Sequence, residues 1–177
     1  AILDILTTGY VLKTPCDILF YEENGKIKSK TPKGYEDFCG MRPPMKNFYT
    51  PYGYHEDHFH WYPNWATELP KGYSAIYLNP IYHFELPFMT VSGIIDNDKF
   101  NTPGLMPFFL RKEFTGIVEA GTPFVQIIPF KRDDWEMELK FYNQDEIVER
   151  FMDQSRTFRT ENGEVYKKTM WTRRKYK

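Results

Sequence analysis

The sequence predicts a mainly β fold in a single domain, a distorted β-barrel or sandwich with one helix near the carboxyl end. Three observations predict it: short apolar runs alternate with turn signals, 13 prolines argue against long helices, and only the last quarter of the chain places apolar residues at helical spacing. With 177 residues, the chain is long enough to bury about two thirds of the surface that its unfolded form exposes.

The first predicted element is a β-hairpin. An apolar run at 18–21 is followed by Asn24-Gly25, and Ile27 then resumes the apolar pattern. Because Asn-Gly accepts the positive φ angles of a tight turn, we expect two antiparallel strands joined there. Residues 40–70 are rich in Pro, Gly and aromatic residues with little periodicity, which predicts a long aromatic loop.

The strand signal is strongest in the middle of the chain. Five apolar segments bounded by turn residues are predicted as strands: 73–78, 91–95, 106–110, 115–118 and 124–128. Together with the hairpin they form a β-rich core over residues 1–142. Residues 143–177 are predicted to be a helix and a basic tail of the same domain.

The predicted helix covers residues 144–158. Asn143 is a suitable N-cap residue, Glu146 follows it by three residues, and Ile147 and Phe151 recur at helical spacing. Residues 167–177 contain Trp171, Arg173 and Arg174 and no acidic residue. Phosphate contacts would suit this tail, but a solvated end or one docked on a neighbouring subunit is the commoner use of such a segment.

Charge and hydropathy exclude some partners. The net charge of −1 gives no global attraction to nucleic acid, and no apolar run is long enough to span a bilayer, so we expect no membrane partner. Two cysteines, Cys16 and Cys39, are interpreted as reduced and structural.

Three motifs occur in order along the middle of the chain: Pro-Lys-Gly-Tyr at 70–73, Gly-Ile-Ile-Asp-Asn-Asp at 93–98, and Gly-Thr-Pro-Phe-Val-Gln-Ile at 121–127. Their order and spacing resemble the dUTPase and dCTP deaminase superfamily over about a third of the chain. The resemblance implies a dUTPase-like (β-clip type) fold, a homo-oligomer such as a trimer, and a nucleotide pocket around Asp96, Asp98 and Gln126.

Several positions depart from that family's pattern. Where the resemblance implies an Arg-Ser phosphate-binding motif, the chain has Asn79-Pro80-Ile81, and Lys99 stands where the family has a tyrosine. The closing glycine-rich motif is also missing. Without charged anchors for a triphosphate, nucleotide hydrolysis is not expected, and we assign no catalytic residue and no cofactor.

A second resemblance covers most of the chain. The run Gly-Thr-Pro-Phe-Val-Gln-Ile-Ile-Pro-Phe-Lys-Arg-Asp-Asp-Trp at 121–135 is similar to uncharacterised proteins of tailed bacteriophages. It implies a phage origin and a shared fold, without a mechanism.

His55, His58 and His60 lie within six residues, beside two acids. This close spacing of histidines suggests a metal site. However, His58 and His60 would share one strand face while His55 points away, and no recognisable metal-ligand motif surrounds His83. A short His-rich surface segment is the favoured interpretation, and no metal ligand is assigned.

We therefore expect a noncatalytic phage protein, a virion structural or protein-interaction module located in the virion or the host cytoplasm. Its partners would be copies of itself and other phage structural proteins, contacted through aromatic and basic residues. The candidate contact residues are Trp61, Trp65, Trp171, Arg173 and Arg174. The alternative is a nucleotide-binding enzyme or sensor of dUTPase-like type with a divergent pocket.

Overall fold

The computed structural model describes residues 2–43, 48–102, 104–159, 168, 171 and 172. Eleven strands and two helices lie in this described part, so the predicted mainly β fold with a C-terminal helix is confirmed. The chain divides into two compact units, Ala1–Arg132 and Asp133–Lys177. Each unit is described below by itself.

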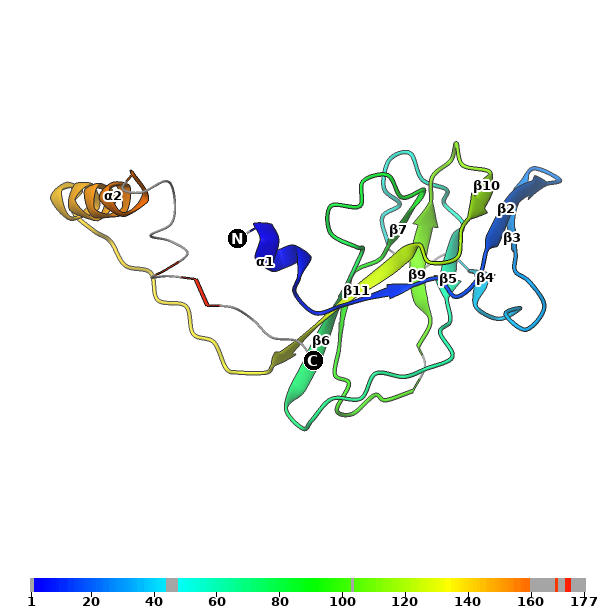
Figure 1. Cartoon of the computed structure of the whole chain (residues 1–177), viewed down its shortest axis with the longest axis horizontal. Coiled ribbons are helices and arrows are strands. Elements are labelled where there is room, and N and C mark those ends of the chain that lie inside the picture. The colour runs from blue at the N-terminus through cyan, green and yellow to red at the C-terminus, as the bar shows by residue number, and fades with distance from the viewer. Residues whose placement is uncertain (1, 44–47, 103, 160–167, 169–170, 173–177) are drawn as a thin grey trace. The chain divides into compact units, whose positions relative to one another are not determined.

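The first unit contains three antiparallel sheets (Figure 1). Sheet A has the order β1 (Tyr10–Lys13), β11 (Pro123–Lys131), β6 (Tyr73–Leu78) and β8 (Gly93–Ile95). Sheet B has the order β10 (Gly116–Val118), β2 (Ile18–Glu23) and β3 (Lys26–Lys30). Sheet C has the order β4 (Cys39–Arg42), β5 (His58–Trp61), β9 (Met106–Leu110) and β7 (Phe88–Thr90). A short helix, α1 (Ile2–Leu6), precedes β1.

Aromatic side chains from all three sheets form one core. The Trp61 ring stacks on Phe108 with centroids 3.8 Å apart, and Phe20 meets Phe59 edge to face at 5.3 Å. Phe124 of β11 packs against Trp61 at 5.3 Å. All five of these side chains are at most 1% exposed, so the rings hold the three sheets together through dispersion and offset ring geometry.

Several predicted elements are confirmed. The predicted hairpin is β2–β3 (Figure 1). Asn24 and Gly25 in its turn both have positive φ, 54° and 72°. β6 and β9 begin and end where the apolar runs predict, and β8, β10 and β11 lie within or overlap the other three predicted strands. Cys16 and Cys39 are free and buried, and burial raises the pKa of the Cys39 thiol to about 12.

The region 40–70 requires a correction. It contains the end of β4 and the whole of β5, so the expected irregular loop is interrupted by sheet C. The periodicity of β5 was hidden because both faces are covered: His58, Phe59 and Trp61 are all buried. A strand covered on both faces shows no alternation of apolar and polar residues.

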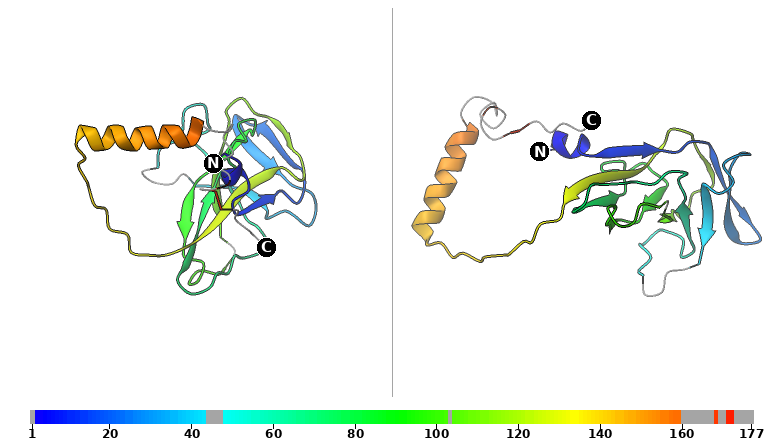
Figure 2. Two further views of the ribbon diagram at one scale, coloured as in Figure 1. Left: turned by 60° about the vertical axis from the view of Figure 1, so that its left-hand side comes forward. Right: turned by 90° about the horizontal axis from the view of Figure 1, so that it is seen from below.

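The helix of the second unit is α2 (Gln144–Arg159), close to the predicted range (Figure 2). Its start is a capping box: Glu146 N donates to Asn143 Oδ1 at 2.9 Å, and Asn143 N donates to the Glu146 carboxylate at 3.0 Å. Neither helix in the described part of the chain has the length and apolar character needed to cross a bilayer.

Candidate functional site

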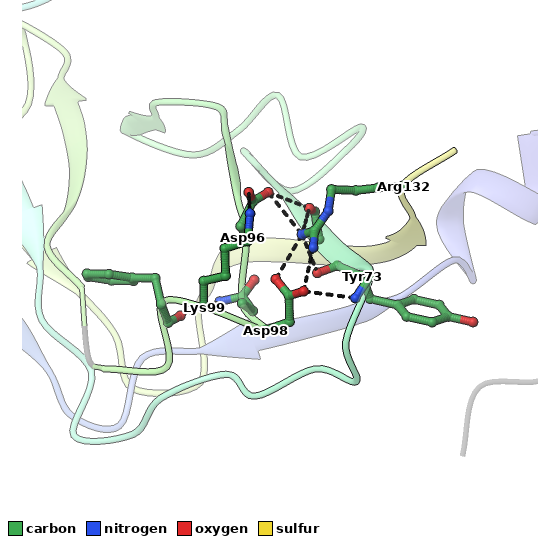
Figure 3. A network of polar contacts seen from close by, with 9 residues as sticks. Tyr73, Asp96, Asp98, Lys99 and Arg132 are labelled. Carbon is green, nitrogen blue, oxygen red and sulfur yellow. Dashed lines mark hydrogen bonds and ion pairs between the residues drawn. The ribbon is translucent and has the colours of Figure 1, made fainter. Parts of the chain in front are cut away.

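The residues around Asp96 and Asp98 form a dense polar network in the first unit, and Figure 3 shows them together. Asp98 is its centre. Its side chain is only 5% exposed, and both carboxylate oxygens accept hydrogen bonds from the Arg132 guanidinium, one of them at 2.9 Å. Gly72 N also donates to Asp98 at 2.8 Å. Arg132 and then Gly72 hold the pKa of the Asp98 carboxyl well below its usual range, so Asp98 stays ionised.

Asp96 is more accessible than Asp98. Its side chain is 43% exposed, Ser74 Oγ donates to its Oδ1 at 2.6 Å, and Arg132 and Lys99 form ion pairs with it at 3.2 and 3.6 Å. These contacts lower the pKa of Asp96, chiefly through the Ser74 hydrogen bond. A carboxylate with a lowered pKa is a weak proton acceptor at neutral pH, so this environment does not favour general-base chemistry.

Arg132 connects three segments of sheet A. Besides the two aspartates, its guanidinium donates to Tyr73 O at 2.9 Å and to Ser74 Oγ at 2.8 Å (Figure 3). Its backbone N donates to Gly72 O at 2.8 Å. The guanidinium thus joins the residues after β11 to the start of β6 and to the turn after β8. This arrangement is a clamp that fixes strand ends through charge-assisted hydrogen bonds.

Gln126 does not join the two aspartates. It is 2% exposed on β11, where its Nε2 donates to Thr8 O at 2.8 Å and Ile5 O at 3.1 Å, and its Oε1 accepts from Ile81 N at 3.3 Å. The amide nitrogen thus anchors the end of α1 and the residues after it, and the amide oxygen holds the backbone at Ile81. The sequence-predicted pocket therefore separates into the Asp96–Asp98 clamp and a buried structural glutamine.

The segment 79–81 makes internal contacts. Asn79 Oδ1 accepts a hydrogen bond from Thr90 N at 2.9 Å, and Ile81 N is the donor to Gln126. A phosphate at this position would have to displace these contacts, and the segment offers no cation to attract it.

A small hollow lies beside the turn that carries the two aspartates. Its volume is about 30 Å³, and Trp65, Tyr77, Asn97 and Phe100 are among the residues that line it. Ligand pockets usually have volumes of about 300–1,000 Å³. This hollow has room for a water molecule rather than a nucleotide.

The histidines differ from the surface segment expected from the sequence. His58 is 1% exposed and packs against the Phe109 ring, while His60 is half-buried, so neither belongs to a His-rich surface. Burial, followed by the Arg42 charge, lowers the pKa of both imidazoles. Over the described residues, no three His, Cys, Asp or Glu side chains come close enough to hold a metal ion. The lowered pKa keeps both imidazoles of β5 neutral at pH 7. His58 Nε2 and His60 Nδ1 are buried without a hydrogen-bond partner in the described part of the chain.

The predicted contact residues have different environments. Trp61 is fully buried, and its Nε1 donates to Thr90 Oγ1 at 3.0 Å, so it belongs to the core rather than to a contact surface. Trp65 is 38% exposed, and Trp171 is partly exposed. Arg173 and Arg174 lie outside the described residues.

Sequence reasoning missed Arg132 as the partner of the two aspartates. No local sequence signal identifies this partnership, because Arg132 is brought to the start of β6 only by the pairing of Lys131 with Tyr73. Comparison with known proteins gives no further guidance: no family model, no curated protein and no solved structure matches this chain.

Proposed function

We propose that this chain is a noncatalytic bacteriophage protein, a virion structural or protein-interaction module built on a dUTPase-like domain. Its proposed partners are copies of itself and other phage structural proteins, in the virion or the host cytoplasm. The observation that carries the noncatalytic part of the proposal is that both Asp98 carboxylate oxygens accept hydrogen bonds, from Arg132 and from Gly72 N. A group that holds the fold in this way is not available to bind a metal-bound triphosphate.

Exposed apolar side chains support the interaction role. Tyr49 and Tyr52 are 79% and 98% exposed in the segment before β5, and Phe84 is 77% exposed between β6 and β7. Large aromatic side chains are enriched in protein–protein contacts, where they bury much area with few rotatable bonds. These three side chains, on the described part of the chain, would lie in the surface that a partner covers.

The test combines particle composition with assembly state. Mass spectrometry of purified particles is expected to detect this chain at a fixed copy number, and light scattering of the purified protein is expected to give an oligomer. A protein that is both monomeric in solution and absent from the particles would refute the proposal.

The nucleotide-binding alternative is supported by one observation, the 43% exposure of Asp96 beside Lys99. A thermal-shift series with deoxynucleoside triphosphates, with and without Mg²⁺, separates the two functions. The noncatalytic proposal predicts an unchanged Tm with every nucleotide. A nucleotide-dependent rise in Tm that disappears in Asp96→Asn would favour the alternative.

A further inference from the structure

Two histidines of β5, His58 and His60, lie on one face of the strand and have buried ring nitrogens without a partner. In the described part of the chain, neither His58 Nε2 nor His60 Nδ1 makes a hydrogen bond, and His58 is only 1% exposed. A neutral imidazole leaves one of its nitrogens without a proton, so this arrangement suits uncharged rings. Protonation would place an N–H group on each of these nitrogens with no acceptor for it, which destabilises the charged form in the folded chain.

The neighbouring strand β4 adds a close contact and a positive charge. Antiparallel pairing sets Arg42 opposite His58 and Gly40 opposite His60. A Cβ atom added at Gly40 would lie 3.1 Å from His60 Cε1, so the imidazole occupies the space that a side chain on β4 would take. The Arg42 charge opposes a second cation on either ring. Because β4 is an edge strand of sheet C and pairs only with β5 there, a charge on these rings acts on the pairing that holds β4.

The groups that face His58 from other directions do not reverse this effect. On its own segment, the Glu56 backbone and the Asp57 carboxylate favour the protonated ring, but burial and the Arg42 charge outweigh them and lower the pKa of His58. β9 places the centroid of the Phe109 ring 5.7 Å from that of the imidazole and adds no charge there. The folded chain therefore stabilises His58 in its neutral form.

The surroundings of His60 also favour a neutral ring. Burial lowers the pKa of His60 most, followed by the charges of Arg42 and His58, and Pro107 opposite it on β9 has no titratable group. Four titratable side chains line an open hollow together with His60: Glu36, Asp37, Cys39 and Tyr62. Gly34 N donates to the Glu36 carboxylate at 2.8 Å, and within the described residues no ion pair joins either acid to His60. A proton on His60 thus has no acidic partner while β4 is paired.

We propose that His58 and His60 form an acid-sensitive latch on sheet C: in mild acid both imidazoles gain a proton, and the edge strand β4 separates from β5. Separation removes Gly40 and Arg42 from the two rings and lets water solvate the new charges. The latch is closed at neutral pH, where both rings are uncharged.

The sign of the pH dependence follows from the two histidines. An unfolded histidine has a pKa of about 6.5, and the pKa of both rings is lower than this in the folded chain. The open form therefore binds protons first, so the stability contributed by the neutral rings is fully present above about pH 6.5 and is lost as the pH falls below it toward the folded pKa. The aspartates of the clamp contribute only near and below about pH 4, so a measurement above pH 5 separates the two effects.

The first test measures hydrogen exchange of backbone amides by NMR on the full chain at pH 7.5 and pH 5.5, corrected for the intrinsic effect of pH on exchange. The amides that pair β4 with β5 are expected to lose protection at least about tenfold at the lower pH. The amides that pair β6 with β11 in sheet A are the internal reference and are expected to keep theirs. Unchanged protection of β4, or an equal loss in both sheets, overturns the latch.

The second test removes the titrating groups. A double variant with His58→Gln and His60→Gln keeps polar side chains of similar length that gain no proton. Between pH 7.5 and pH 5.5, urea denaturation of the wild type is expected to show an unfolding constant that rises at least about tenfold, and the double variant is expected to show almost no rise. His55→Gln, in the segment before β5, is the matched control and is expected to behave as the wild type. A double variant with the wild-type rise contradicts the role of the two rings.

A third measurement uses the wild-type chain alone and decides the question even where the double variant fails to fold. Carbon–proton NMR spectra of the imidazoles follow the protonation of each ring, and the single variants His58→Gln and His60→Gln assign the signals. Both rings are expected to titrate with midpoints below about 6.5, over the same pH range in which β4 loses amide protection. Midpoints at or above that value, or protonation of both rings with β4 still protected, would show that no latch exists.

Discussion

Asp98 remains charged although its side chain is nearly enclosed, because Arg132 and the Gly72 amide supply the interactions that water would otherwise provide. The same contacts give Asp98, predicted from the sequence as a pocket residue, a structural role in sheet A. Asp96 has the more exposed carboxylate, yet Ser74 and Arg132 also engage it. The clamp therefore depends on Asp96, Ser74 and Arg132 as well as on Asp98.

Replacing Asp98 tests the clamp directly. Asp98→Asn is expected to lower the Tm at pH 7 by about 4 °C or more, because Arg132 loses its bidentate partner. Calorimetry measures the change. Asp37→Asn, which alters an exposed acid, is the matched control and is expected to leave the Tm nearly unchanged. Equal Tm values for the two variants would contradict the clamp.

The pH dependence of stability follows from the lowered pKa of Asp96 and Asp98. An unfolded aspartate has a pKa of about 3.9, so the contribution of the clamp is fully present above that value and is lost as the pH falls below it toward the folded pKa. Urea unfolding between pH 6 and pH 2.5 is expected to show a steep loss of the free energy of unfolding below pH 4 in the wild type. The loss is expected to be shallower in Asp98→Asn. An identical slope in both proteins would show that ionised Asp98 does not cause the dependence of the free energy of unfolding on pH.

Trp61 and Trp65 provide a matched pair for core and surface. Trp61→Ala removes a fully buried ring and is expected to lower the free energy of unfolding by about 3–5 kcal/mol. Trp65→Ala, at a side chain that is 38% exposed, is expected to cost about 1 kcal/mol. Urea denaturation measures both. Similar values for the two variants would show that Trp61 does not have the core role assigned to it.

At the scale of elements, local signals predicted only part of the fold. The Asn24-Gly25 turn, the apolar run of β6 and the capping box of α2 are local, so the sequence reveals them. The strands β1, β4, β5 and β7 have only three or four residues each and depend on tertiary pairing. The candidate site follows the same rule: motifs identified Asp96 and Asp98, but Arg132 reaches them only through the pairing of β11 with β6.

The capping box of α2 is testable by itself. Asn143→Ala removes the acceptor for Glu146 N and is expected to lower the stability of the helix by about 1 kcal/mol. The backbone amides of its first turns are then expected to exchange roughly fivefold faster. Gln154→Ala, a change at an exposed site in the same helix, is the control. Hydrogen exchange detected by NMR measures both, and equal exchange rates in the two variants would show that the cap does not hold the helix.

At the scale of the whole molecule, two kinds of surface have different roles. The polar network of the first unit fastens the strand ends of sheet A. In the second unit, the apolar side chains of Trp135, Met137, Leu139 and Phe141 are largely exposed. A protein whose acids are committed to its own fold, and whose apolar groups are exposed, is suited to assembly rather than to phosphate chemistry. This contrast is the basis of the proposed noncatalytic role.

The most direct test is a ³¹P NMR titration of deoxyuridine and deoxycytidine triphosphates with the full chain and Mg²⁺. We predict phosphate resonances that neither shift nor broaden at stoichiometric protein, and no inorganic phosphate or pyrophosphate after prolonged incubation. Shifted resonances or released pyrophosphate that vanish in Asp96→Asn would contradict the noncatalytic proposal, since they would place a bound triphosphate at the clamp.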